Sequence, residues 1–178
     1  MPKQTHSLPT EQAIDIAIQH HQEGRLTEAE TMYQQVLRNE PNQPIALHLL
    51  GAIACQSGNN DVAVDLISQA LSIKPDYAEA YSNLGLALQA LGQTEKATEQ
   101  YRTAISLKPD LAEAHNNLGV VLRDIGKLED AVTSFRKSLA INPEYADALD
   151  NLGSTLRDLG NPQDALTNHR KALTIRPD

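Results

Sequence analysis

The sequence repeats itself every 34 residues, and this period constrains the fold more than any other feature. Proline returns at that interval, at Pro41, Pro75, Pro109, Pro143 and Pro177. Two glycine series and one alanine series keep the same interval: Gly24, Gly58, Gly92, Gly126 and Gly160; Gly51, Gly85, Gly119 and Gly153; Ala29, Ala63, Ala97, Ala131 and Ala165. A fixed period of this length is typical of stacked supersecondary units, so we expect a repeat array rather than one globular core.

The repeating proline also sets the expected boundaries. If each unit ends two residues after it, residues 1–9 form a leader and residues 10–178 form the array. The five repeats are then 10–43, 44–77, 78–111, 112–145 and 146–178. Each of them reads as two helices joined by a glycine-containing turn.

The third unit shows how each repeat is expected to fold. Its first helix is predicted over residues 78–91 and ends at Gly92, because glycine readily adopts the left-handed conformation of a helix C-cap. A second helix is predicted over residues 94–107, and it stops before Pro109, which cannot continue a helix.

A capping box is predicted at the start of the first helix. Asp76 precedes Glu79 by three residues, and Asp110 and Glu113 repeat that spacing one unit later. In a capping box the two side chains accept hydrogen bonds from backbone N–H groups that the helix start leaves unpaired.

Apolar residues at helical spacing form one stripe on each helix of the third unit. The stripes are Tyr81, Leu84, Gly85 and Leu88 on the first helix and Ala97, Tyr101 and Ala104 on the second. One hairpin cannot bury both stripes, so neighbouring repeats must stack into an all-α solenoid. Gly85 costs about 1 kcal/mol of helix propensity relative to Ala, and its recurrence indicates a crossing too close for a side chain.

This pattern resembles the tetratricopeptide repeat (TPR) over all but the first nine residues. The fullest match is in the third unit, at Tyr81, Leu84, Gly85, Ala97, Tyr101, Ala104 and Pro109. The resemblance implies a right-handed α-solenoid of five helix-turn-helix units, whose first helices line a concave groove. It also implies a general role as a protein-interaction scaffold. The first unit departs most, since it has Ala17 where the other units have the close-contact glycine.

Asn83, Asn117 and Asn151 form a column opposite the core stripe of the first helices. One interpretation is a solvated polar face that recurs through repeat duplication. The other is a binding face, because a carboxamide offers a donor and an acceptor that can bracket an extended peptide backbone. The stretches Tyr81–Gly85 and His115–Gly119 resemble the asparagine ladder of O-linked N-acetylglucosamine transferases and their bacterial relatives. That resemblance implies backbone contacts for the three asparagines.

Two charged pairs recur one unit apart near the end of the first helix, Arg123 with Asp124 and Arg157 with Asp158. They are either solvated charges that favour the helix end or pair between units, or a device that selects charged side chains beside a bound backbone. Both interpretations stay open from the sequence.

The first two units place apolar residues at groove-facing positions, namely Ile14, Ile18, Ile45 and Leu49. These residues are covered either by the leader, through Leu8 and Pro9, or by neighbouring side chains. The alternative hypothesis is an apolar patch, with Ile14, Ile18 and Leu49 as its centre, that a partner helix or a second copy covers.

A carboxylate clamp, which some TPR domains use to hold acidic peptide tails, is not expected here. Such a clamp needs Lys, Arg and Asn on the groove face. The second residue of each unit is instead acidic or apolar, and lysine is absent from that face: Glu11, Ile45, Glu79, Glu113 and Asp147.

Composition excludes several other classes of function. The net charge of −8 and an aromatic content of 3% disfavour nucleic acids and anionic lipid surfaces as partners. The single cysteine, Cys55, allows no intrachain disulfide and no cysteine-based zinc site. The six histidines fit no metal-ligand motif, and no nucleophile elbow or phosphate-binding loop is present. We therefore expect no enzyme activity, no cofactor and no metal.

The chain has no signal-peptide or transmembrane pattern, and a cytoplasmic location is expected. Leu166, Leu173 and Ile175, on the last helix, are expected to lack cover, as in an uncapped solenoid end. Three functions remain open. The chain is a scaffold for a protein or peptide ligand, a substrate-recognition arm of a larger glycosyltransferase-type enzyme, or a module that forms homo-oligomers by stacking through its uncapped end.

Overall fold

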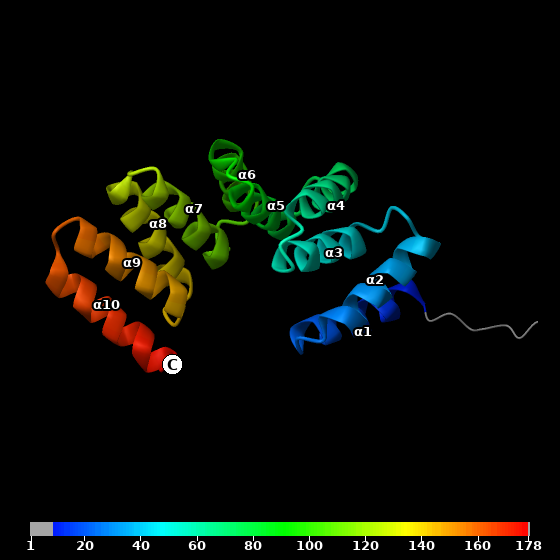
Figure 1. Ribbon diagram of the computed structural model, residues 1–178, viewed down its shortest axis with the longest axis horizontal. Coiled ribbons are helices and arrows are strands. Elements are labelled where there is room, and N and C mark those ends of the chain that lie inside the picture. Colours follow the sequence, from blue (N-terminus) through cyan, green and yellow to red (C-terminus); the bar gives the residue numbers. More distant parts are fainter. Residues whose placement is uncertain (1–8, 178) are drawn as a thin grey trace, which may run out of the picture. The chain divides into compact units, whose positions relative to one another are not determined.

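The computed structural model describes residues 9–177, and within them it contains ten α-helices and no strand (Figure 1). The helices are α1 (Thr10–Gln22), α2 (Leu26–Asn39), α3 (Pro44–Gln56), α4 (Asn60–Ile73), α5 (Ala78–Ala90), α6 (Thr94–Leu107), α7 (Ala112–Asp124), α8 (Leu128–Ile141), α9 (Ala146–Asp158) and α10 (Pro162–Ile175). Consecutive helices pack pairwise as five hairpins. The predicted all-α solenoid is confirmed. The chain divides into two compact units, Met1–Asp76 and Tyr77–Asp178.

The turn inside each hairpin is a glycine turn, as predicted. Gly92 has a positive φ of 72°, and its backbone N–H donates to the carbonyl of Gln89 at 2.9 Å. The N–H of Gln93 donates to the carbonyl of Leu88 at 2.9 Å. This pair of bonds is the Schellman motif, which satisfies carbonyls that the end of α5 leaves unpaired. The same backbone conformation recurs at Gly24, Gly58, Gly126 and Gly160.

The predicted capping boxes are wrong. The N-cap residue of α5 is Tyr77, one residue later than the box requires, and its side chain makes no capping hydrogen bond. The N-cap residue of α7 is likewise Leu111 rather than Asp110. With Tyr77 as the N-cap residue, Glu79 is the second residue of the helix rather than the third, which a capping box requires. Glu79 instead forms an ion pair with Lys108.

The recurring glycine inside the first helices is a site of close approach, as predicted. An alanine Cβ at Gly85 would lie 2.6 Å from Cε1 of Tyr101, whose side chain is fully buried. At Gly119 the same distance to Cε1 of Phe135 is 2.6 Å. These aromatic rings of the second helices lie directly against the glycine backbone, so each of these two hairpins packs one ring into the space that a side chain would otherwise take.

Residues 77–177 form a stack of three hairpins with two distinct sides. The second helix of one repeat packs against the first helix of the next, α6 against α7 and α8 against α9. The first helices of adjacent repeats also pack together, α5 with α7 and α7 with α9, whereas the second helices share no comparable packing. The first helices are therefore closer together. We call the side of α5, α7 and α9 that faces away from the second helices the inner face.

The last helix carries apolar side chains without cover. Leu166 and Leu173 of α10 are 43% and 59% exposed, whereas Leu139, the counterpart of Leu173 one repeat earlier, packs against the core of α7, α8 and α9. Ile175 is also exposed, at 42%, but its counterpart Ile141 is 38% exposed inside the stack. The exposure of Ile175 therefore does not result from its place on the last helix.

Candidate functional site

The asparagine column lies on the inner face of residues 77–178. Asn83 of α5, Asn117 of α7 and Asn151 of α9 are all half-buried, whereas Leu84 and Leu88, on the opposite side of α5, are buried. The 34-residue period places one asparagine on each of three adjacent helices that pack against each other. The three carboxamides therefore stand in register along this face.

A hydrogen-bond network joins the asparagines of α7 and α9. Nδ2 of Asn151 donates to Oδ1 of Asn116 at 3.1 Å, and Nη1 of Arg123 donates to Oδ1 of Asn151 at 3.1 Å. Nδ2 of Asn116 donates to Oδ1 of Asn117 at 3.3 Å. The buried amide of Asn116 is thus the centre of the network, and it holds its two half-buried neighbours in a fixed orientation.

The network leaves part of the hydrogen-bonding capacity of Asn151 unused. A carboxamide has two N–H donors and an oxygen with two lone pairs. In the described structure Asn151 uses one N–H and one lone pair for its bonds to Asn116 and Arg123. At this residue a second N–H and a second lone pair remain for a ligand, and their direction is set in advance by the bonds already made.

Sequence reasoning missed the role of Asn116. The residue stands one position before the column, and its counterparts in the third and fifth repeats are Ser82 and Asp150. An asparagine at this place in one repeat only was the signal available in the sequence. Aligning the repeats does not find such a residue, because the alignment selects residues that the repeats share.

The two charged pairs form within their own helices and not between repeats. Nε of Arg123 is 3.7 Å from Oδ1 of Asp124, and Nε of Arg157 is 3.8 Å from Oδ1 of Asp158. Arg123 also reaches the next repeat through its bond to Asn151, whereas Arg157 is largely exposed. Arg123 thus belongs to the asparagine network, and Arg157 with Asp158 forms a separate surface pair.

A second register consists of charged residues that recur at the N-terminal ends of the first helices. Nζ of Lys108 is 2.7 Å from Oε1 of Glu79, and Nη2 of Arg176 is 2.8 Å from Oδ1 of Asp147. In each case the acid is the second residue of a first helix, and the cation follows the second helix of the same repeat as its C-cap. The pair in the third repeat holds the pKa of Lys108 above its usual value through the hydrogen bond and charge of Glu79.

The fourth repeat breaks this register. Its acid is Glu113, and Asn142 stands where the neighbouring repeats have a cation. Oδ1 of Asn142 accepts a hydrogen bond from the backbone N–H of Glu144 at 3.2 Å, so this side chain closes its own turn. Desolvation raises the pKa of the Glu113 carboxyl. Desolvation, together with the charges of Glu113 and Asp147, raises the pKa of Tyr145 to about 12.

The predicted apolar patch of the first two units needs a correction at Ile14. This side chain is 4% exposed and belongs to a core cluster with Tyr33 and Val36, so it offers no contact surface. Ile18 and Leu49 are half-buried and pack against that cluster from outside, as does Ile45. Leu8, the predicted cover of the patch, lies outside the described residues.

The cysteine and the histidines of the described residues show no arrangement typical of a catalytic or metal site. Desolvation raises the pKa of the Cys55 thiol, which lowers its thiolate fraction at neutral pH. Nε2 of His115 lies 3.0 Å from the carbonyl oxygen of Pro109, and Nδ1 of His169 lies 3.1 Å from Oδ1 of Asp150. Within residues 9–177 no three His, Cys, Asp or Glu side chains are placed to hold one metal ion.

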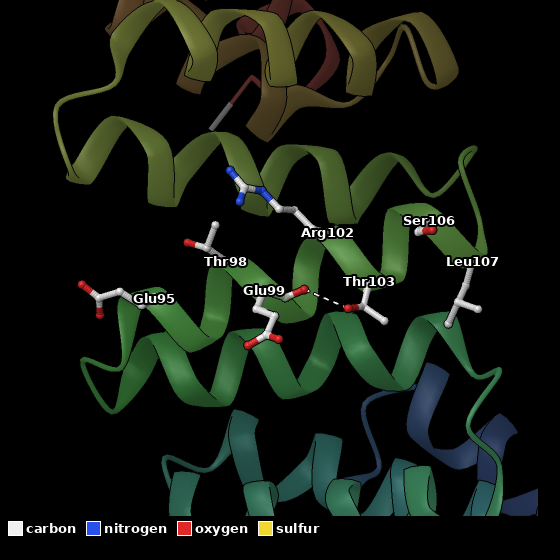
Figure 2. Close-up of a pocket in the computed structure, with 7 residues that line it drawn as sticks. All are labelled: Glu95, Thr98, Glu99, Arg102, Thr103, Ser106 and Leu107. Atoms are coloured by element: carbon white, nitrogen blue, oxygen red, sulfur yellow. Dashed lines mark hydrogen bonds between the residues drawn. The ribbon is translucent and has the colours of Figure 1, made fainter.

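A shallow hollow on α6 has no convergent chemistry either. Figure 2 shows that its lining side chains all come from this single helix and splay away from each other. Oγ1 of Thr103 donates to the backbone carbonyl of Glu99 at 3.0 Å, so this hydroxyl is used by its own helix. Among the helices of the described residues, none has the length and apolar character needed to cross a bilayer.

Family models match residues 53–178 in three overlapping segments. A model described as TPR repeat matches residues 53–92 and 88–123, and one described as tetratricopeptide repeat matches residues 110–178. No curated protein matches the chain.

Solved structures of repeat proteins are similar over nearly the whole chain. TTC0263, a thermophilic TPR protein in Thermus thermophilus, is 23% identical with a TM-score of 0.83, covering 96% of this chain and 93% of that one. MamA is 25% identical with a TM-score of 0.74, covering 91% and 95%. YrrB, described as a TPR protein with an unusual peptide-binding site, is 26% identical with a TM-score of 0.67, covering 93% and 86%.

Proposed function

Because this chain belongs to the tetratricopeptide repeat family of protein-interaction scaffolds, we propose that it is a non-catalytic scaffold that binds an extended peptide segment of a partner protein. The peptide lies along the inner face of α5, α7 and α9. The observation that carries this proposal is the register of Asn83, Asn117 and Asn151 on three helices in contact.

The spacing of the column suits an extended backbone. Packed helices lie about 8–10 Å apart, and an extended chain advances about 3.3 Å per residue. Each repeat therefore spans about three peptide residues. This is one turn of an extended polyproline II backbone, so each asparagine can meet one backbone amide in every three on the same side. A carboxamide that offers one donor and one acceptor can pair with the N–H and C=O of that residue. Such contacts bind a backbone with little dependence on its side chains.

The similarity to YrrB supports the class of ligand and no more. That protein is described as having an unusual peptide-binding site. The alternative in which this chain is the substrate-recognition arm of a glycosyltransferase-type enzyme uses the same inner face. Peptide binding by the isolated chain is common to both alternatives.

The test compares wild type with an Asn83→Ala, Asn117→Ala, Asn151→Ala variant. A peptide is first selected by wild type from an immobilised random-sequence library, and its affinity for both proteins is then measured by fluorescence anisotropy. Three lost hydrogen-bonding positions at about 1 kcal/mol each predict an affinity roughly a hundredfold weaker.

A matched control removes hydroxyl groups from the second helices, one per repeat. Thr98, Thr133 and Thr167 each donate to a carbonyl of their own helix, so a triple Thr→Ala variant should bind the peptide as wild type does. Circular dichroism confirms that both variants keep their helices. Equal affinity of the asparagine variant and wild type would overturn the proposal.

A second candidate function is self-association through α10. The observation that favours it is the exposure of Leu166 and Leu173, whose counterparts one repeat earlier are covered by α9. Covered apolar side chains of this size stabilise a repeat interface by about 1.5–3 kcal/mol each. A second copy that supplies a helix at this surface would gain the same contacts.

A further inference from the structure

The acidic register at the start of the first helices contains one carboxylate that lacks its cation. Glu79 and Asp147 each meet a cation 29 residues later, Lys108 and Arg176, at 2.7 Å and 2.8 Å. The same interval from Glu113 leads to Asn142. The local backbone is the same in all three repeats, because α6, α8 and α10 all end with this residue as their C-cap.

No other cation of this region pairs with Glu113 in place of the one that is missing at residue 142. Within residues 9–177 no ion pair includes Glu113. Arg123, on the same helix, is engaged with Asp124 and with the carboxamide of Asn151. Asn142 is turned toward its own loop through its bond to the Glu144 amide. The exposed carboxylate of Glu113 therefore has no internal counter-ion, and desolvation by neighbouring atoms raises its pKa.

The hydroxyl of one aromatic residue lies within electrostatic range of this carboxylate. Tyr145, the N-cap residue of α9, is half-buried and lies close enough to Glu113 and Asp147 for both charges to act on its hydroxyl. A carboxylate without a counter-ion is suited to an ammonium or guanidinium group, which can pair with it through charge-assisted hydrogen bonds. The neighbouring repeats show that a cation is accommodated at this place, since Lys108 and Arg176 occupy it.

We propose that Glu113 forms a subsite that takes a lysine or arginine side chain from the bound peptide. The ligand then supplies in trans the cation that Lys108 and Arg176 supply in cis in the adjacent repeats. This inference rests on the proposed peptide-binding function and deepens it. The asparagine column binds the backbone without selecting a sequence, and the subsite adds a requirement for one basic residue opposite the fourth repeat. The acidic net charge of −8 favours the approach of such a ligand.

The competing explanation is that Glu113 only stabilises its own helix. An acid in the first turn stabilises a helix through its dipole, and α5, α7 and α9 each have one there. That role requires no ligand and predicts no preference among peptides. The two explanations differ in what happens when the missing cation is restored.

The experiment uses the full chain and two stages of binding. Wild type, Glu113→Gln and Asn142→Lys are each used to select from the same random peptide library. A peptide selected by wild type is then synthesised twice, once with its basic residue and once with norleucine, which keeps the length and removes the charge. Glu79→Gln is the matched control, because its carboxylate is already paired with Lys108.

Wild type and Glu79→Gln are expected to enrich Lys or Arg at one peptide position and to bind the lysine peptide about tenfold more tightly at low salt. Glu113→Gln removes the charge, and Asn142→Lys fills the subsite from within, so both should bind the two peptides equally well. Salt should reduce the preference of wild type toward that common affinity.

The outcomes separate this inference from the function on which it rests. If no peptide binds to wild type, both are overturned. If peptides bind but wild type shows no preference for the basic residue, the subsite is overturned and the backbone-binding function stands. A preference that survives in Glu113→Gln or in Asn142→Lys would also overturn the subsite.

Discussion

At the residue scale, the packing of each hairpin in residues 77–178 depends on a glycine that faces a ring. Gly119 lies against Phe135, Gly85 against Tyr101 and Gly153 against His169. The glycines lower helix propensity, yet the rings fill the space that a Cβ would need. The aromatic residues are few, and two of them, Tyr101 and Phe135, are placed where one ring closes one helix crossing.

Replacing Gly119 by alanine should destabilise the fold. The new Cβ would lie 2.6 Å from a ring that is fully buried and cannot move aside. Overpacking of this kind costs about 1–3 kcal/mol, which exceeds the gain in helix propensity of about 1 kcal/mol. We expect a net loss of about 1 kcal/mol in the free energy of urea unfolding. Gly153→Ala is the control, because His169 is only half-buried and can shift, so its loss should be smaller. A Gly119→Ala variant as stable as wild type would contradict this account.

At the element scale, much of the local fold could be predicted from the period. The helices predicted over residues 78–91 and 94–107 agree with α5 and α6 to within one residue, and Gly92 has the predicted conformation. These features depend on residues close in sequence. The capping box failed because the N-cap residue of α5 is Tyr77 and not Asp76. Glu79 is therefore the second and not the third residue of the helix, and it pairs with Lys108.

The exposed face of α10 makes a prediction about self-association. A Leu166→Glu, Leu173→Glu variant places charges on the uncovered apolar surface, and it should shift any concentration-dependent mass toward the monomer. The measurement is sedimentation equilibrium over a range of protein concentrations. Thr167→Glu, on the same helix, is the matched control, because its hydroxyl bonds to its own helix. A mass that rises with concentration equally in all three proteins would exclude this surface as the interface.

At the scale of the whole molecule, the sequence predicted the class of fold and the face that carries the proposed site, but not how its side chains are connected. The column of Asn83, Asn117 and Asn151 follows from the period alone. The bond from Asn151 to Asn116 and the missing partner of Glu113 do not, because both depend on a residue that differs between repeats. Contacts between side chains of neighbouring repeats are visible only once the helices are placed.

The measurement that tests the central claim most directly is the footprint of a bound peptide on the folded chain. Side-chain amide resonances of asparagine can be followed by nuclear magnetic resonance while a selected peptide is titrated to saturation. The account predicts shifts at Asn83, Asn117 and Asn151 and protection of the amides of α5, α7 and α9, with little change at Asn168 on α10. Shifts confined to the second helices or to residues 9–76, with the three asparagines unchanged, would contradict it.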